Sequence, residues 1–159
     1  MYLNKRKTIF LISIFLLVFL LTINDIKSQE LKVIDGATIH LNGKKIRFIG
    51  IDTPELKQNC IKEGAIEQCG LTAKKILIEK IGDSKVKCIS EGKDQYKRIL
   101  AECFVNNESL SSYLVRSGYA FAYRKYSKKF IKDEDYARTK KFGMWAMKFD
   151  YPWDYRINN

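Results

Sequence analysis

Hydrophobic positions change their spacing along the chain, and the first apolar segment has no polar face. Residues 8–23 form an uncharged, strongly apolar run that follows the basic residues Lys5 to Lys7. A helix buried in a soluble domain would carry a polar face, so this layout is typical of a secretory signal or an uncleaved N-terminal anchor. Residues 26–28 (IKS) offer only one small residue for cleavage. Both alternatives stay open for residues 1–28, and in either case the following chain crosses the membrane.

Beyond this segment the apolar residues alternate with polar ones, which is the period of a β-strand. Two such runs, TIHL and KKIRFIGI, flank Asn42-Gly43. Asn-Gly between alternating runs is the strongest short hairpin signal, because a type I′ turn needs positive φ at both central residues. Closing the turn there pairs Ile39 with Ile46 and Thr38 with Arg47.

This register has two consequences for the sheet. It places four apolar side chains on one face, the expected core face: Ile39, Leu41, Ile46 and Phe48. It also puts Ala37 and Arg47 on opposite faces, so that bringing both to one site requires a β-bulge or strong coiling near Asp35-Gly36.

Three later segments show helical spacing. The first, residues 67–80, ends at Gly82, which suits a helix C-cap. The second, NNESLSSYLVRSG, ends at Gly118. The third, SKKFIKDEDYARTKKFG, is expected to begin at Ser127 as N-cap and to end at Gly143 as C-cap.

Two further strands, SKVKCIS and RILAECFV, and an aromatic tail complete the pattern; the tail is expected to pack back on the domain. If the strands form a hairpin about Gln95-Tyr96, Cys88 and Cys103 lie directly opposite each other. An even number of cysteines beyond a secretory segment suggests two disulfides. Three pairings are possible. We favour Cys88–Cys103 for that geometric reason and Cys60–Cys69, which would close a short polar loop.

Length and charge narrow the function classes. The element order predicts one α+β domain, residues 29–159, built on a small sheet or barrel. Of the net charge of +11, residues 1–28 carry +3, so the domain carries +8. That charge favours an anionic partner such as nucleic acid or an anionic surface, although a basic surface can also serve solubility alone. The only histidine is His40, and without closely spaced ligand pairs a zinc site is disfavoured.

Acids and arginines gather around the first hairpin. Asp52 and Glu55 follow its second strand, Asp35 lies at the nearby turn, Arg47 lies within the strand, and Arg98 opens a later strand. Carboxylates are hard ligands for calcium or magnesium, and arginine forks bind phosphate oxygens. A metal-holding acid, a carboxylate near the attacking water and two arginines are the parts that phosphodiester cleavage needs. Taken singly, each residue can also be a turn cap or a solvated surface charge.

A resemblance to a known family links these residues. The segments VIDGAT, IRFIGIDTPE, DQYKR, LVRSGYAFAY and FGMW follow the order and spacing of the thermonuclease (staphylococcal nuclease-like) family. Residues 33–153 resemble its secreted bacterial branch most, through ELKQNC, a following CG, paired cysteines on two later strands and a PW near the end. The resemblance implies an OB-fold, a five-stranded barrel with three helices, and a calcium-dependent phosphodiesterase that acts on DNA and RNA.

By matching position, the resemblance assigns roles to five residues around the phosphate and the metal. Glu55 resembles the carboxylate that orients or deprotonates the attacking water. Arg47 and Arg98 resemble the pair that stabilises charge on the phosphorus. Asp52 resembles a calcium-ligating carboxylate, and Thr53 resembles a residue that contributes its backbone carbonyl.

The resemblance also implies how the nucleotide is bound. Tyr96 and Tyr123 resemble tyrosines that contact it. Because every base has a flat face, stacking on such rings tolerates any sequence, and single-stranded DNA and RNA are the expected partners.

Two departures from the family pattern bear on activity. The turn that usually reads Asp-Gly-Asp-Thr reads DGAT, so Ala37 replaces a calcium-ligating aspartate, and either Asp35 or a water would have to take its place beside Asp52. Calcium affinity follows the number of charged ligands, so activity is expected to be weakened. The usual Tyr-Gly-Arg reads YKR; Lys97 would add phosphate affinity, but its backbone is less permissive next to Arg98.

Three hypotheses follow from these patterns. The first is an exported calcium-dependent endonuclease of broad specificity, which the retention of Arg47, Glu55 and Arg98 favours. The second is a catalytically inactive OB-fold module that binds nucleic acid or another anion, which Ala37 favours. The third is an envelope interaction module whose barrel is only a scaffold, and it rests on the N-terminal segment alone. We expect a monomer that is periplasmic, secreted or anchored, and that meets the membrane only through residues 1–28.

Overall fold

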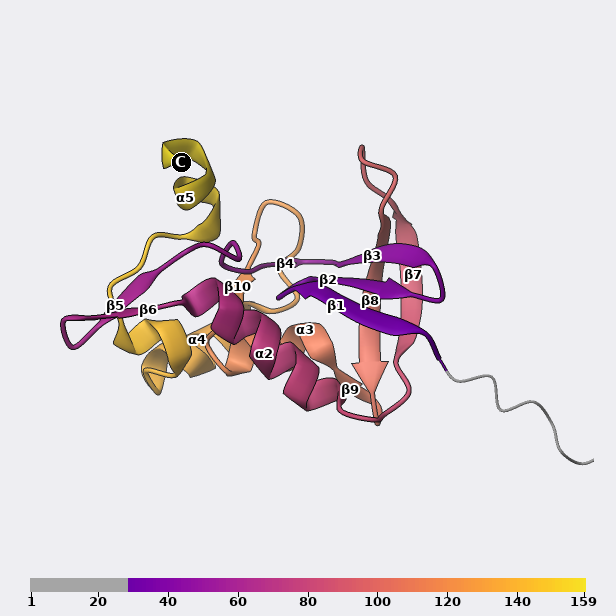
Figure 1. Cartoon of the computed structure of the whole chain (residues 1–159), viewed down its shortest axis with the longest axis horizontal. Helices are drawn as coiled ribbons and strands as arrows, with labels where there is room; N and C mark the ends of the chain where they lie inside the picture. Colours follow the sequence, from indigo (N-terminus) through magenta and orange to yellow (C-terminus); the bar gives the residue numbers. More distant parts are fainter. Residues whose placement is uncertain (1–28) are drawn as a thin grey trace, which may run out of the picture.

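The domain is built around one strongly twisted mixed sheet (Figure 1). The computed structural model describes residues 29–159, so the predicted signal or anchor segment, residues 1–28, lies outside the described residues. No helix within residues 29–159 is long and apolar enough to cross a membrane. The strand order is β1-β2-β3-β8-β7, with β9 added to β8. These strands are β1 (Leu31–Asp35), β2 (Thr38–Leu41), β3 (Lys44–Phe48), β7 (Lys87–Lys93), β8 (Ile99–Val105) and β9 (Glu108–Ser109).

Pairing within the sheet is antiparallel except between β3 and β8, which run parallel. Two short ribbons lie beside it: β4 (Ile51–Asp52) with β10 (Phe121–Ala122), and β5 (Cys60–Lys62) with β6 (Ala65–Glu67). The helices are α2 (Cys69–Ile81), α3 (Leu110–Arg116), α4 (Ile131–Thr139), the 3₁₀ helix η1 (Gly143–Ala146) and α5 (Pro152–Asn158). This arrangement agrees with the expected sheet-rich α+β class and is consistent with an OB-like fold, but α5 makes a fourth α-helix within residues 29–159, where three were expected.

The first hairpin has the predicted register. Ile39 pairs with Ile46 and Thr38 with Arg47, and the turn residues Asn42 and Gly43 both have positive φ, +50° and +74°. All four residues of the predicted core face are buried. The predicted bulge is also confirmed, because the register between β1 and β2 shifts between positions 33 and 35. The chain therefore turns sharply just before Ala37.

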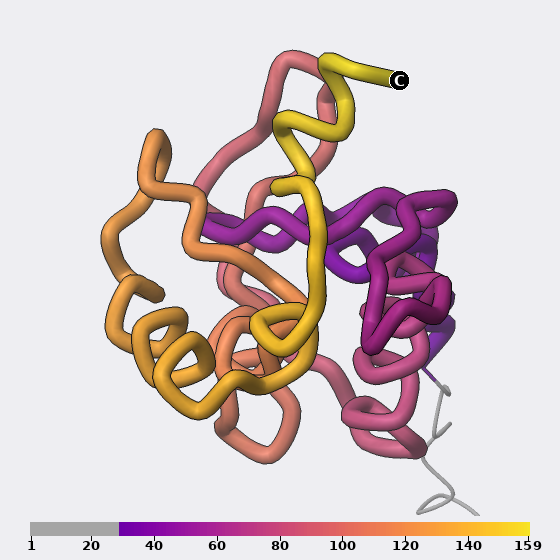
Figure 2. The backbone as a smooth tube through the Cα atoms, turned by 90° about the vertical axis from the view of Figure 1, so that its left-hand side faces the viewer, coloured from indigo at the N-terminus to yellow at the C-terminus, as the bar shows by residue number. Residues whose placement is uncertain are grey.

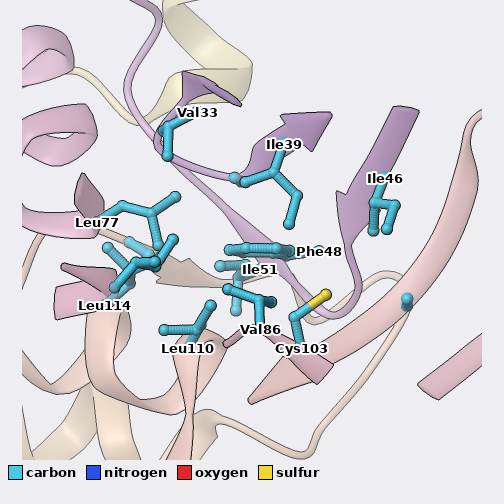
Figure 3. Packing of buried hydrophobic residues seen from close by; sticks show 14 of the residues in the cluster. Val33, Ile39, Ile46, Phe48, Ile51, Leu77, Val86, Cys103, Leu110 and Leu114 are labelled. Carbon is cyan, nitrogen blue, oxygen red and sulfur yellow. The ribbon is translucent and has the colours of Figure 1, made fainter. Parts of the chain in front are cut away.

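The core lies between the sheet and helices α2 and α3. Figure 3 shows side chains from both layers meeting around Phe48, which is 1% exposed. The labelled residues from the strands include Ile39 and Ile46, and those from the helices include Leu77 and Leu114. Burial of each large apolar side chain contributes about 1.5–3 kcal/mol, so this cluster fixes the sheet on which the site is built.

The first two predicted helices agree with the structure, and the third does not. Helix α2 ends as expected at Gly82, whose N–H donates to the Ile78 carbonyl at 2.9 Å. Helix α4 covers only Ile131–Thr139, so the predicted caps Ser127 and Gly143 are wrong. The Ser127 hydroxyl instead accepts the N–H of Lys129 at 3.1 Å, which closes a local turn before the helix can start.

The aromatic tail packs back on the domain, as predicted. A second buried cluster contains Phe121 and Met144, with Trp145, Tyr151 and Trp153 partly buried against it. Figures 1 and 2 show the tail rising past the sheet and ending in α5, which projects from the same side of the sheet as the β7–β8 turn. The tail thereby brings its last residues to one edge of the sheet.

Both favoured disulfides are present. Cys88 and Cys103 face each other across β7 and β8, with Cα atoms 4.0 Å apart. Cys60 on β5 is bonded to Cys69 at the start of α2, with Cα atoms 5.8 Å apart. The predicted short polar loop that this second bridge closes forms the β5–β6 hairpin.

Candidate active site

Five chain segments surround one cleft of about 890 Å³. They are the turn between β1 and β2, the stretch from β3 to the residues after β4, the β7–β8 turn, the loop after β10, and α5. The cleft brings together most of the predicted site residues: Asp35, Arg47, Asp52, Thr53, Glu55, Tyr96, Arg98 and Tyr123. Lys97 is exposed and lies outside the lining, so its role in substrate binding stays a prediction.

The deepest charge in the cleft is the carboxylate of Asp52, whose side chain is 2% exposed. Its Oδ1 atom lies 2.7 Å from Arg47 Nη2, and its Oδ2 atom lies 2.6 Å from Arg156 Nη2. The backbone N–H of Thr53 also donates to Oδ1, at 3.2 Å. A buried carboxylate needs this many partners, because an unpaired charge at such a position would be costly.

Arg156, Asp94 and Tyr126 also line the cleft and were not predicted from the sequence, and Arg156 has the most contacts with the predicted acids. Besides Asp52, it binds Glu55, with Nη1 and Oε1 2.8 Å apart. Burial acts to lower the pKa of Arg156, but its hydrogen bonds to Asp52 and Glu55 and their charges outweigh burial and raise that pKa above its ordinary value. The guanidinium therefore stays charged and bridges the two carboxylates. The PW near the end of the chain was the only sequence signal for this segment.

A second ion pair organises the β7–β8 turn. Asp94 Oδ2 accepts from Arg98 Nε at 2.6 Å, and Asp94 Oδ1 accepts the backbone N–H groups of Tyr96 and Arg98, both at 2.9 Å. Because Arg98 uses Nε for this bond, its terminal nitrogens keep no protein partner among residues 29–159. Lys97 adopts φ +62° in the same turn, a backbone conformation that favours glycine.

Aromatic rings of the loop after β10 and of the β7–β8 turn also line the cleft, and we call them the aromatic wall: Tyr96, Tyr123 and Tyr126. Tyr123 stacks on Trp153 of α5 with ring centroids 5.6 Å apart and meets the exposed Tyr126 edge-on at 4.9 Å. Tyr96 is 71% exposed, and the Arg98 guanidinium lies 5.5 Å from its ring centroid. One face of Tyr123 is therefore covered by the protein itself, whereas Tyr96 and Tyr126 present open rings.

Ala37 itself contributes no ligand to the cleft, although Asp35 in the same turn lines it. Ala37 is fully buried, and its N–H donates to Asp35 Oδ1 at 2.8 Å. A Cβ on Gly36 would lie 3.0 Å from Cβ of Thr53 and of Ala73, so the turn is packed tightly against α2. The hydroxyl of Thr38, which lines the cleft, is buried and has no hydrogen-bond partner within the described part of the chain.

The donor set does not fit the calcium ion that the resemblance implies. Calcium takes six to eight oxygen ligands, largely from carboxylates. Both oxygens of Asp52 already bind guanidinium groups, Glu55 binds Arg156, and one oxygen of Asp35 accepts a backbone N–H. In residues 29–159, no group of three or more His, Cys, Asp and Glu side chains is arranged to hold a metal ion.

Comparison with known proteins finds one matching family and several related proteins. The model of the family described as staphylococcal nuclease homologue matches residues 45–147. A Haemophilus influenzae protein named as an uncharacterized endonuclease is 29% identical over 125 residues, which are 74% of this chain and 65% of that protein. A probable staphylococcal-like nuclease CAN2 of Oryza sativa is 31% identical over 70% of this chain and 29% of its own length. Endonuclease YncB of Bacillus subtilis is 30% identical over 72% of this chain and 59% of its own length. The chain thus spans less than two thirds of each of these relatives.

Proposed function

As the chain belongs to the family of staphylococcal nuclease homologues, we propose that it is an endonuclease that hydrolyses phosphodiester bonds within DNA and RNA with little sequence specificity. The observation that carries the proposal is the meeting of Arg47, Glu55 and Arg98 around one cleft, although Arg98 comes from the β7–β8 turn, far along the chain from the other two. Two arginines and one carboxylate facing a common space are the groups that phosphoryl chemistry uses for charge stabilisation and proton transfer.

In the proposed reaction, Glu55 acts as the general base. It takes a proton from a water molecule, and the water oxygen forms the new bond to phosphorus. The P–O bond to the leaving oxygen breaks, and that oxygen is protonated by solvent. Arg47 and Arg98 bind the non-bridging oxygens, on which negative charge grows as the new bond forms. The free terminal nitrogens of Arg98 suit this role, because they can donate two hydrogen bonds to one phosphate.

Substrate binding in this proposal depends on the aromatic wall. Tyr96 and Tyr126 offer exposed rings on which bases can stack. Tyr123 supports the wall through its stack with Trp153. Stacking contributes about 1–3 kcal/mol per base and does not read sequence, and it requires unpaired bases. We therefore propose single-stranded DNA and RNA as preferred substrates.

Calcium is the cofactor that the resemblance implies, with Asp52, Thr53 and Asp35 as the residues that would use it. Because the arrangement of these residues does not fit the ion, the proposed reaction uses only side chains of the protein. The requirement for calcium is measured directly in the experiment below.

Export is part of the same proposal. Two disulfides are compatible with an oxidising compartment outside the cytoplasm. We propose a monomer that acts in the periplasm, in the medium or on the outer side of the membrane, held there, if at all, by residues 1–28.

The test is cleavage of fluorescein-labelled single-stranded DNA and RNA of mixed sequence by the full-length oxidised chain, in calcium and in EDTA. We expect internal fragments from both substrates in at least one condition. Glu55→Gln should lower the rate by about 100-fold or more, as expected for loss of a general base. Glu79→Gln is the matched control, because Glu79 is an exposed carboxylate on α2 outside the cleft. Equal rates for Glu55→Gln and Glu79→Gln would contradict the assignment.

The second candidate function is a binding module without catalysis. Ala37 and the engagement of Asp52 and Glu55 by Arg156 favour it, because both reduce the ligands left for a metal. Intact binding of labelled single-stranded DNA, measured by fluorescence anisotropy, together with no cleavage in calcium or EDTA, would support this alternative.

A further inference from the structure

The guanidinium of Arg156 lies between the two carboxylates that would face a metal ion in this cleft. It binds Asp52 through Oδ2 at 2.6 Å and Glu55 through Oε1 at 2.8 Å. We propose that Arg156 supplies the positive charge that the resembling enzymes take from calcium, so that this cleft works without a divalent cation. The inference rests on the proposed nuclease function.

The charge balance of the cleft favours this assignment. The carboxylates of Asp52 and Glu55 are paired with the guanidinium groups of Arg47 and Arg156, which makes the group neutral. Without Arg156, two carboxylates would face an incoming phosphate with only one guanidinium beside them, and like charges would repel the substrate. Arg156 removes that repulsion as a bound cation would.

The ligand geometry disfavours a divalent ion in the same place. An ion that approached Asp52 would have to displace a guanidinium from a carboxylate that is only 2% exposed. At position 37, where a second aspartate would compensate for that displacement, the chain has a buried methyl group. The missing carboxylate at position 37 and the presence of the Arg156 guanidinium therefore both disfavour a divalent cation in this cleft.

Arg156 is held in place by the segment that carries it. Trp153, one turn earlier on α5, stacks between Tyr123 and Tyr151, at centroid distances of 5.6 and 4.7 Å. The side-chain amide of Gln58 donates to the carbonyl of Asp150 at 2.7 Å, just before the helix. Because α5 is anchored to both the aromatic wall and the residues after β4, the guanidinium of Arg156 is held in a fixed position in the cleft.

Cleavage in EDTA is the first arm of the test, using the full-length oxidised chain and labelled single-stranded DNA. We expect the wild type to cleave in EDTA at a rate within about twofold of its rate in calcium. Arg156→Gln should lose about 100-fold or more in EDTA, comparable to removing one preorganised charge-stabilising donor. Arg156→Lys should retain part of the rate, because it keeps the charge but not the planar fork. Arg138→Gln, which removes an exposed arginine of α4, should behave as the wild type.

Calcium binding by titration calorimetry is the second arm and does not depend on cleavage. We expect no saturable binding to the wild type up to about 1 mM, the weak end for extracellular calcium sites. Saturable binding should appear in the double variant Ala37→Asp/Arg156→Gln. Circular dichroism checks that this double variant is folded. If it is not, Arg156→Gln alone replaces it in the titration, because freeing Asp52 and Glu55 should by itself give detectable calcium binding.

The outcomes separate the inference from the proposed function. Cleavage by the wild type that requires calcium overturns the inference and leaves the nuclease intact, as does an Arg156→Gln variant that matches or exceeds the wild type in EDTA. A wild-type cleavage rate that rises in calcium because the ion displaces Arg156 would also overturn the inference and leave the nuclease proposal intact. If neither the wild type nor any variant cleaves, the nuclease proposal fails, and calorimetry alone tests the inference. Saturable calcium binding by the wild type then overturns the inference. Saturable calcium binding that appears only in the variants supports it.

Discussion

Asp94 and Arg98 bind each other at the tip of the β7–β8 turn, with Oδ2 and Nε 2.6 Å apart. The same carboxylate accepts the backbone N–H groups of Tyr96 and Arg98. One aspartate therefore fixes both the course of the turn and the direction of a guanidinium that faces the cleft. Asp94 itself has no partner role in the proposed chemistry, so its effect is one of positioning.

Replacing Asp94 by alanine should lower kcat/KM about 10- to 100-fold, because small displacements of a positioned group are costly in rate. The thermal unfolding midpoint should fall by only a few degrees, since the turn is exposed. Asp135→Ala is the matched control, because Asp135 forms an exposed ion pair with Arg138 within α4, away from the cleft. Similar rates for the two variants in the cleavage assay would show that Asp94 does not position Arg98.

The same aspartate should make stability depend on pH in the acid range. Burial acts to raise the pKa of Asp94, but the hydrogen bonds and charge of Arg98 outweigh burial and hold the pKa below its ordinary value of 3.8. A lowered pKa in the folded state contributes stability above pH 3.8 that is lost as the pH falls through the folded-state pKa. The difference in melting temperature between wild type and Asp94→Asn should therefore shrink as the pH is lowered from about 6 to about 2. A difference that stays constant over this range would refute the coupling.

Lys97→Gly should stabilise the protein by about 0.5–1 kcal/mol in urea denaturation. Lys97 is held at φ +62°, where a side chain is strained and glycine is not, although glycine also increases the entropy of the unfolded chain. Lys93→Gly provides the contrast, because Lys93 lies in β7 with ordinary strand backbone. This variant should lower the free energy of unfolding by a similar amount. If both variants lose stability, the strain at position 97 is negligible.

The elements that could be predicted from sequence are those whose determinants are local. Asn42-Gly43 and the alternation on either side of it fix the register of β2 and β3. The opposition of Cys88 and Cys103 follows in the same way from a single hairpin, even though a second bulge shifts the register between Ser90 and Gly92. In both cases a short stretch of chain contains its own turn and its own core face.

The charge arrangement of the cleft could not be predicted, because its partners are distant in the sequence. Arg156 lies 104 residues from Asp52 and 101 from Glu55, and no periodicity relates them. Helix α4 shows the converse: Ser127 is a good N-cap by composition, but its hydroxyl is used in a turn with Lys129, and the helix begins later. A contact between distant residues decided the first outcome, and a local turn decided the second.

Removing either disulfide should lower stability by about 2–4 kcal/mol, with the Cys88–Cys103 bridge at least as important as the Cys60–Cys69 bridge. In the chain-entropy account the effect grows with the length of the closed loop, and the two bridges span 15 and 9 residues. Paired Cys→Ala variants compared in urea denaturation measure the two contributions separately. Peptide mapping of the oxidised protein that finds other pairings or free thiols would contradict the assignment.

Trp153 should matter for activity chiefly through Arg156, although its stack with Tyr123 also supports the aromatic wall. It stacks on Tyr123 with the ring planes 4° apart, and this contact holds α5 against the cleft. Trp153→Ala should therefore release the helix and lower the cleavage rate in EDTA by about the same factor as Arg156→Gln. Trp153→Phe, which keeps a ring for stacking, should recover most of the rate. The double variant Trp153→Ala/Arg156→Gln should be no slower than Arg156→Gln alone, because residues that act through one contact are not additive. Additive losses would instead mean that Trp153 binds the nucleic acid directly, and an unchanged rate for Trp153→Ala would mean that α5 stays in place without the stack.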